Sequence, residues 1–241
     1  MQELAVLASR AITTQREFTA VADNIANATT QGFRKLEMEF RESVSKPANH
    51  ATASYVEDRA LHISQKQGVM ETTGNPLDMA ISGEGFFAID VNGSRQYTRR
   101  GQFVVNPEGT LTTPEGYTVL GSAGEPVQIP AGATSLKLAQ DGTLSTDAGQ
   151  FSRIGVFSFA AADMGRLQRA GATAFVATQG AAPVVVEAPL LKQGYLEGSN
   201  VNAVEEMTNM QMVSRAYESS IRLMKGLEDL ESRAIRELTP Q

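Results

Sequence analysis

The sequence predicts an α+β fold, with an α-helix at each end of the chain and a mostly antiparallel β domain between them. Residues 2–27 contain neither Pro nor Gly and place their apolar residues at helical spacing. Residues 202–238 contain no Pro and a single Gly, Gly226, and follow the same spacing. Between about residues 74 and 194, short apolar runs alternate with turn sequences, which is typical of antiparallel β-structure.

The first predicted helix carries an apolar seam of the kind found in coiled coils. Its apolar residues follow one another in alternating steps of three and four, with Thr14 occupying one position of the series. With the usual rise per residue, a helix over residues 2–27 is roughly 39 Å long. The seam consists of Leu4, Leu7, Ala11, Phe18, Val21, Ile25 and Ala28.

The C-terminal helix carries a matching pattern, in which charged residues such as Glu218 and Lys225 separate the apolar positions. We expect the two seams to face each other in a coiled-coil-like helical domain. Glu205 and Glu206 are interpreted as part of a solvated helix face rather than as an acid–base pair. The apolar positions are Met207, Met210, Tyr217, Ile221 and Met224, and Leu227, Leu230 and Leu238 prolong the pattern with a phase shift.

The middle of the chain predicts short strands joined by tight turns. Asn92-Gly93 and Asp141-Gly142 supply the positive φ angles that hairpin turns require. Residues 106–113 (NPEGTLTT) and 139–146 (AQDGTLST) share one shape and are interpreted as similar hairpin corners. Residues 160–171 are too short and too interrupted for a long helix. Strands are expected at residues 86–89, 103–105, 118–120, 127–129, 136–138, 154–159 and 184–186.

These patterns divide the chain into three parts. Residues 1–34 and 198–241 form the predicted helical domain, which serves as the assembly core. Residues 35–73 mix charged with small residues and are predicted to form an extended connector. Residues 74–197 form a β-rich outer domain.

The composition argues against several classes of function. The formal net charge of −6 disfavours nucleic-acid binding. The chain contains no Cys, which excludes thiolate metal sites and Cys nucleophiles. His50 and His62 have no motif partner, and no phosphate-binding glycine motif is present. We therefore expect a protein that is not an enzyme, without catalytic, metal or cofactor-binding residues and without a cofactor.

The first residues also bear on export. Arg10, Arg16, Glu17 and Asp23 interrupt the N-terminal segment, so it lacks the apolar core of a secretory signal peptide. No stretch approaches the length of apolar sequence that spans a membrane. If the protein leaves the cytoplasm, we expect it to do so without a cleaved signal peptide and without membrane insertion.

Several separated stretches resemble the flagellar axial proteins, and above all the basal-body rod proteins. Residues 22–34 (ADNIANATTQGFR) resemble their N-terminal signature, with Asp23 where the family usually has Asn. Residues 73–89 (TGNPLDMAISGEGFFAI) and 97–111 (YTRRGQFVVNPEGTL) resemble the family core, and residues 193–224 resemble its C-terminal motif. Pro76 favours the proximal-rod members over the distal-rod members.

The resemblance implies a structural subunit of the bacterial flagellar proximal rod. Such a subunit polymerises through its terminal helices and forms part of the axial drive shaft and protein-export channel. The implied partners are other rod proteins, copies of the same chain and the flagellar type III export apparatus, in the periplasmic part of the basal body. No nucleic acid and no small-molecule substrate is implied.

The predicted assembly interface combines both seams with the polar end of the first helix. Asn24, Asn27 and Gly32 are expected to shape that helix end and the exit into the connector, and the two amides to bond neighbouring groups. An alternative hypothesis is a soluble β-rich ligand-binding module with helical oligomerisation arms. The predicted interface residues are Leu4, Leu7, Phe18, Val21, Asn24, Ile25, Asn27, Gly32, Met207, Met210, Tyr217, Ile221 and Met224.

Overall fold

The computed structural model describes residues 2–45, 53–130, 135–147, 149–178 and 180–238. The chain divides into two units, which are described separately. Unit 1 comprises Met1–Ala26, Leu36–Leu61 and Asn202–Gln241, and unit 2 comprises Asn27–Lys35 and His62–Val201. The predicted α+β class is confirmed, because a helix lies at each end of the chain and a mostly antiparallel β region lies between them.

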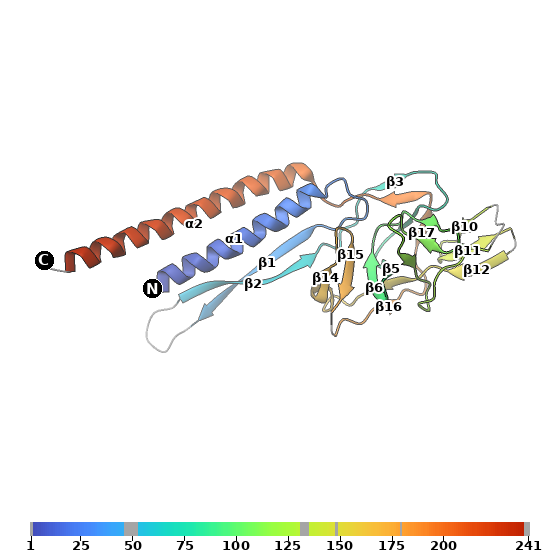
Figure 1. Cartoon of the computed structure of the whole chain (residues 1–241), viewed down its shortest axis with the longest axis horizontal. Helices are drawn as coiled ribbons and strands as arrows, with labels where there is room; N and C mark the ends of the chain where they lie inside the picture. Colours follow the sequence, from blue (N-terminus) through green and yellow to red (C-terminus); the bar gives the residue numbers. More distant parts are fainter. Residues whose placement is uncertain (1, 46–52, 131–134, 148, 179, 239–241) are drawn as a thin grey trace. The chain divides into compact units, whose positions relative to one another are not determined.

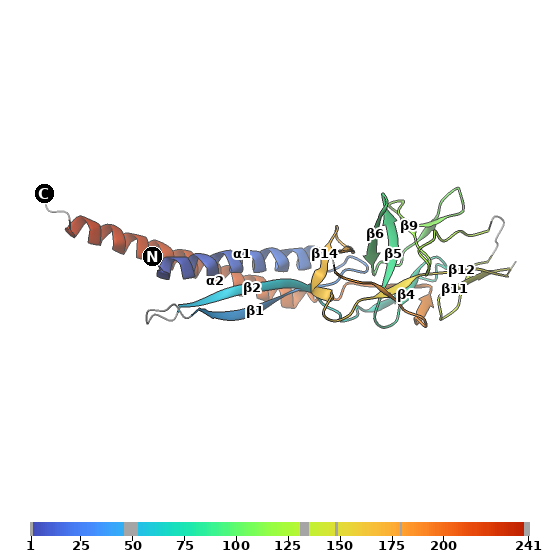
Figure 2. The same cartoon turned by 90° about the horizontal axis from the view of Figure 1, so that it is seen from below.

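Unit 1 contains the two helices and a two-stranded ribbon (Figure 1). Helices α1 (Gln2–Ala26) and α2 (Ala203–Leu238) lie side by side and run antiparallel, so that the two chain termini lie at the same end of this unit. Strands β1 (Leu36–Ser45) and β2 (Ala53–Ile63) pair with each other, and β1 also contacts α1. Figure 2 shows that α2 continues past the first residues of α1.

The predicted extended connector therefore contains paired strands. Pairing β1 with β2 satisfies backbone N–H and C=O groups that a single extended strand would leave to water. The charged and small side chains of this segment do not by themselves predict the pairing. It forms because the chain reverses direction after β1 and β2 runs back beside it. Pro47, the one strong punctuator of the segment, lies outside the described residues.

Unit 2 consists of short strands and one turn of 3₁₀-helix, η1 (Met164–Arg166). Every strand pair within its described part is antiparallel. The strands are β3 (Met70–Thr72), β4 (Met79–Ile81), β5 (Phe86–Val91), β6 (Ser94–Thr98), β7 (Val104–Val105), β8 (Leu111–Thr112), β9 (Thr118–Val119), β10 (Lys137–Leu138), β11 (Thr143–Thr146), β12 (Gly149–Arg153), β13 (Val156–Ser158), β14 (Leu167–Arg169), β15 (Ala174–Ala177), β16 (Val184–Val185), β17 (Leu191–Gln193) and β18 (Tyr195–Glu197).

The largest sheet has the order β14-β15-β6-β5-β9-β8-β7, and β13 joins it by pairing with both β5 and β16. Strands β10, β11 and β12 form a separate three-stranded sheet. The last two strands, β17 and β18, pair with the early strands β4 and β3. The last strands of the segment His62–Val201 are thus paired with its first strands.

The predicted β pattern agrees closely with the structure. Each predicted strand has a counterpart except residues 127–129, where Val127 is buried but Gln128 makes only an isolated bridge to Thr110. Asn92 and Gly93 both have positive φ, as the hairpin between β5 and β6 requires. The two similar sequences are both hairpin corners, and they place Leu111 and Leu144 in the same buried core.

The core of unit 2 comes from the alternate residues of these strands that point inward. Phe87 and Phe103 meet edge to face with ring centroids 5.3 Å apart, an arrangement that aromatic pairs prefer. The buried cluster consists of Met79, Ile81, Phe87, Ile89, Phe103, Leu111, Val119, Val127, Leu144, Ile154, Val156 and Leu191. Burial of these apolar side chains gives this unit a folding core of its own.

Candidate assembly interface

The packing face of α1 consists mainly of small residues. Thr13 and Thr14 are buried, and each hydroxyl is satisfied because it donates to a backbone oxygen four residues earlier, that of Ser9 and Arg10 respectively. Burial also raises the pKa of the Glu17 carboxyl on this helix. From Val6 onward, where the side chains of α1 are described, the most buried residues are Ala11, Thr13, Thr14, Ala20, Val21 and Asn24.

This buried face only partly matches the predicted seam. Ala11, Thr14 and Val21 are on both, and Leu7 and Ile25 are half-buried. Phe18 differs, because 38% of it is exposed to solvent in the single chain. The side chain of Leu4 is outside the described residues. The heptad spacing predicted the helix, but the centre of the buried face is shifted toward Thr13 and Ala20.

Among the α2 residues whose side chains are described, Glu206, Val213 and Ser220 are buried, and they are spaced by whole heptads. Met210, Ile221 and Met224 are half-buried beside them. Met207 and Tyr217 differ from the expected packing, because they are exposed, Met207 by 54%. A narrow stripe of α2 is therefore buried, whereas the predicted interface residues Met207 and Tyr217 lie on the surface of the helix.

The interpretation of Glu206 as a solvated residue is wrong. Only 1% of this residue is exposed, whereas Glu205 is on the surface. The side-chain amide of Asn24 donates to Glu206 Oε2 at 3.2 Å, and Asn209 donates to Glu206 Oε1 at 3.4 Å. Glu206 also lies in the first turn of α2, where the helix dipole stabilises a negative charge. These partners explain how a carboxylate is accommodated between the helices.

Asn24 connects three segments of unit 1. Its Nδ2 donates to the backbone oxygen of Leu36 at 3.0 Å, and its Oδ1 accepts from the backbone N–H of Leu36 at 2.9 Å. The same amide reaches Glu206 on α2. Asn24 is buried and thus fixes the last turn of α1 against both the start of β1 and the start of α2. Within the single chain, this amide therefore bonds both a backbone group and a side chain.

We expect Asn24→Asp to destabilise unit 1 by about 2–4 kcal/mol, because it places a carboxylate against Glu206 and the Leu36 carbonyl. Gln15→Glu is the matched control. Gln15 is exposed on the same helix, so a carboxylate there stays in water and we expect a change within about 0.5 kcal/mol. Urea unfolding followed by helical circular dichroism measures both. Equal stabilities for the two variants would contradict the role assigned to Asn24.

The second half of the signature sequence belongs to unit 2. Gly32 has φ +71°, and its N–H donates to the Glu197 carbonyl at 2.7 Å. A Cβ at this position would lie 2.7 Å from Arg100 Cα, closer than such atoms approach. Gly32 is therefore needed both for its backbone conformation and for the close passage of another segment. Phe33, the next residue, is completely buried.

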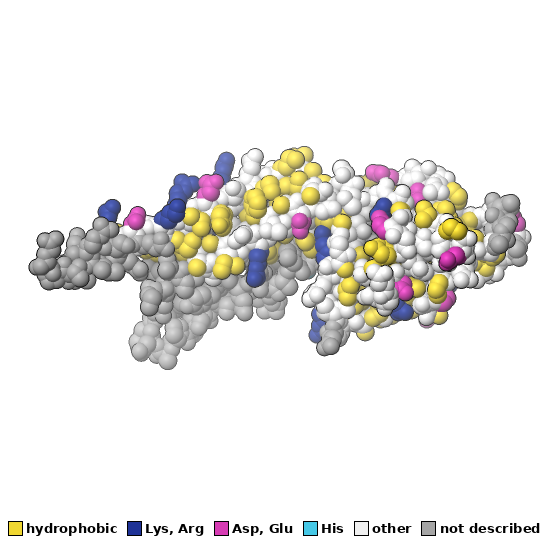
Figure 3. Space-filling view, viewed as in Figure 1, with side chains coloured by type: hydrophobic (Ala, Val, Ile, Leu, Met, Phe, Trp, Pro, Cys, Tyr) yellow, Lys and Arg dark blue, Asp and Glu magenta, His cyan; other side chains and the backbone are white. Residues whose placement is uncertain are grey.

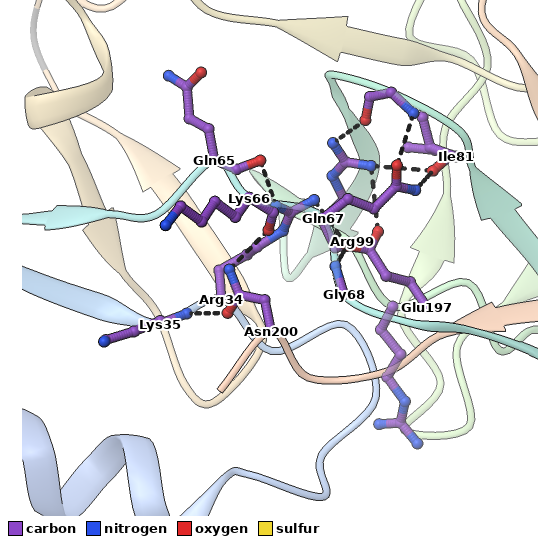
Figure 4. A network of polar contacts seen from close by, with 12 residues as sticks. Arg34, Lys35, Gln65, Lys66, Gln67, Gly68, Ile81, Arg99, Glu197 and Asn200 are labelled. Atoms are coloured by element: carbon purple, nitrogen blue, oxygen red, sulfur yellow. Dashed lines mark hydrogen bonds and ion pairs between the residues drawn. The ribbon is translucent and has the colours of Figure 1, made fainter. Parts of the chain in front are cut away.

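A buried ion-pair network at this position was not predicted from the sequence. Arg34 Nη2 lies 2.8 Å from Glu197 Oε1, and Arg99 Nη1 lies 3.3 Å from Glu197 Oε2 (Figure 4). The three residues come from three of the stretches that carry the family resemblance. Glu197 is the single charged residue within QGYLEGSN, and this isolation is the one sequence signal that points to a buried carboxylate.

Backbone carbonyls around this network accept further hydrogen bonds from the two arginines. Arg34 Nη1 donates to the carbonyls of Gln65 and Lys66, and Arg99 Nη2 donates to the Gly83 carbonyl at 2.5 Å. Close by, the Lys35 N–H donates to Asn200 Oδ1 at 2.7 Å. Lys35 ends the first peptide segment of unit 2, and Asn200 lies near the end of the second. This bond therefore joins the two segments beside the network.

Over the described ranges, no group of three or more His, Cys, Asp or Glu side chains is placed to hold a metal ion. His62 is half-buried in β2, and His50 is outside the described residues. Neither described helix combines the length and the apolar character needed to cross a membrane.

Comparison with known proteins gives concordant matches. Residues 80–146 match the family described as the flagellar hook protein FlgE/F/G D1 domain, and residues 192–237 match the flagellar basal body rod FlgEFG protein C-terminal family. The chain is 36% identical to the flagellar basal-body rod protein FlgF of Caulobacter vibrioides over 95% of both chains. It is 34% identical to FlgF of Rhizobium meliloti over 98% of this chain and 97% of that protein. FlgG of Bacillus subtilis is 30% identical over 90% of this chain and 91% of that protein.

Proposed function

The chain belongs to the family of flagellar basal-body rod proteins and is FlgF-like, and from this premise we propose that it polymerises through its terminal helices into the proximal rod. As a member of this family it is a structural protein of the basal body that assembles with other rod components, and it is not an enzyme. Membership favours this role over the alternative of a ligand-binding module.

The observation that carries the proposal is a row of exposed apolar residues on α2. Met212, Leu223 and Leu230 are each more than half exposed. Their spacings of eleven and seven residues are close to whole helical turns, so they share one face of the helix. That face is not the face of Glu206, Val213 and Ser220, which packs inside unit 1. Figure 3 shows hydrophobic side chains gathered along the part of unit 1 that the helices form.

This row has the properties expected of a contact between subunits. A soluble protein gains nothing from large apolar residues in water, whereas burying one completely contributes about 1.5–3 kcal/mol. Phe18 on α1 and Met207 on α2 add further exposed apolar surface to the same unit. We propose that helices of neighbouring subunits cover these residues and extend the pair into a coiled-coil-like assembly core.

The proposed role also concerns export. Together, the subunits of the axial shaft surround the channel through which later flagellar proteins are exported. We propose that this chain itself reaches the periplasmic rod through the flagellar type III export apparatus, without a cleaved signal peptide. Its neighbours are copies of itself and other rod proteins.

The double variant Met212→Gln/Leu223→Gln tests the proposal. Because both side chains are exposed in the single chain, we expect each substitution to change the free energy of unfolding of the chain by no more than about 0.5 kcal/mol. We nevertheless expect loss of swimming motility and of isolated rods when the variant replaces the natural protein in the bacterium. Immunoblotting establishes that the variant is present at the normal level.

The control is Val69→Gln/Val184→Gln, which removes two apolar residues of unit 2 that are at least as exposed as Met212 and Leu223. We expect normal motility, because the proposed contacts lie on the helices. Normal motility in the α2 variant, or equal loss in both variants, contradicts polymerisation through this helix face.

A further inference from the structure

Two buried arginines line a small pocket inside unit 2. Arg34 and Arg99 share its wall with the hydroxyl side chains of Ser64 and Ser158 and with Glu84. The pocket has a volume of about 20 Å³, which is space for one group the size of a water molecule.

The charges around this pocket do not balance. Arg34 and Arg99 are both almost completely buried, and within the described part of the chain the buried carboxylate that contacts them is that of Glu197. Two cations therefore share one anion. Desolvation, and then the positive charge of Arg34, lower the pKa of Arg99 to about 10, so that it is still protonated at neutral pH. Glu84 at the pocket wall is exposed, and its negative charge raises the pKa of Arg99 by less than burial and Arg34 lower it, so it compensates the second arginine only in part.

The hydrogen bonds of the two guanidinium groups are also incomplete. Arg34 Nε and Arg99 Nε are buried and have no hydrogen-bond partner among the described residues. A buried donor without an acceptor is costly, and it is more costly on a charged group. A water molecule in the pocket would accept from a donor, but it would leave the excess positive charge uncompensated.

We propose that this pocket binds one monovalent anion of the size of chloride, held by Arg34 and Arg99. Such an ion supplies an acceptor for charged N–H groups and balances the second arginine. The ion stabilises unit 2 at the point where Arg34 and Glu197 join its two peptide segments. This binding site is independent of the helix contacts proposed for rod assembly.

Thermal unfolding of the full chain tests the proposal. Sodium chloride is compared with sodium gluconate at equal ionic strength, because gluconate is too large for the pocket. We expect chloride to raise the unfolding midpoint of unit 2 by about 2–4 °C and the effect to saturate. Line broadening in chlorine NMR of the same protein reports binding directly. Equal midpoints in the two salts, with no line broadening, overturn the proposal.

Three variants locate the site. Arg99→Gln removes the excess charge and should abolish the chloride effect, whereas Arg100→Gln removes a neighbouring, partly exposed arginine and should retain it. Glu84→Gln removes an exposed negative charge and should lower the half-saturating chloride concentration by about twofold to fivefold without affecting folding. If Arg99→Gln does not fold, the Glu84→Gln titration decides. An unchanged half-saturation in Glu84→Gln, or a retained chloride effect in folded Arg99→Gln, contradicts a site at this pocket.

Discussion

Replacing Glu197 with Gln is expected to destabilise unit 2 by about 3–5 kcal/mol. The substitution keeps the size of the side chain but removes the negative charge that lies 2.8 Å from Arg34 and 3.3 Å from Arg99. Both arginines are buried, so neither can turn to water to recover its solvation. The backbone N–H of Gly68, which donates to Glu197 Oε1 at 3.0 Å, also loses a charged acceptor. Urea unfolding of the purified chain, followed by circular dichroism of the β-structure, measures the loss.

Glu115→Gln provides the comparison within the same unit. Glu115 also pairs with an arginine, Arg100, but both side chains are partly exposed to water. An exposed pair contributes about 0–1 kcal/mol, so this variant should unfold close to the wild-type urea concentration. A loss for Glu197→Gln no larger than that for Glu115→Gln would show that the buried network does not stabilise the unit.

Replacing Gly32 with Ala is expected to destabilise unit 2 by about 2–5 kcal/mol. One contribution is the positive φ of +71°, which an L-residue with a Cβ adopts unfavourably. The other is the added methyl group, which meets the backbone of Arg99 and Arg100 rather than a movable side chain. Moving that backbone displaces Arg99 from Glu197, so the variant also weakens the ion-pair network.

Gly74→Ala separates these two contributions. Gly74 has φ +72°, nearly the same as Gly32, but a Cβ there meets nothing within 4 Å. We expect a loss of about 1–2 kcal/mol from the backbone conformation alone. The difference between the two variants in the same urea experiment measures the cost of the close approach. Equal losses would show that Arg100 does not restrict the position of residue 32.

The helices show how far periodicity predicts structure. The steps of three and four identified both helices and their approximate ends, because helical spacing is a local property of the sequence. Which residues of α2 face α1 was predicted less well. Met207 and Val213 are both apolar, yet Met207 is exposed and Val213 is buried. The choice depends on the antiparallel pairing near Asn24 and Glu206, which brings together residues far apart in the chain.

The polar residues of the site were predicted in part. Asn24 and Gly32 were identified from the resemblance, and the structure supplies the physical reason for each. Glu206 was assigned to the surface because two adjacent carboxylates on a helix are more often part of a solvated face than an acid–base pair. Its burial follows from Asn24 and Asn209, whose amides donate to it. A carboxylate with such donors is stable where an unpartnered one is not.

By itself, the sequence determined what depends on neighbouring residues: the two terminal helices, the tight turns and most strands between them, and the family signature at residues 22–34. The tertiary structure alone decided what depends on distant residues. It brought Arg34, Arg99 and Glu197 together, buried Glu206 beside Asn24, and left Met212, Leu223 and Leu230 on the surface. The physical reason is that hydrogen-bond patterns within a helix or turn are local, whereas charge burial and side-chain exposure depend on which segments pack together.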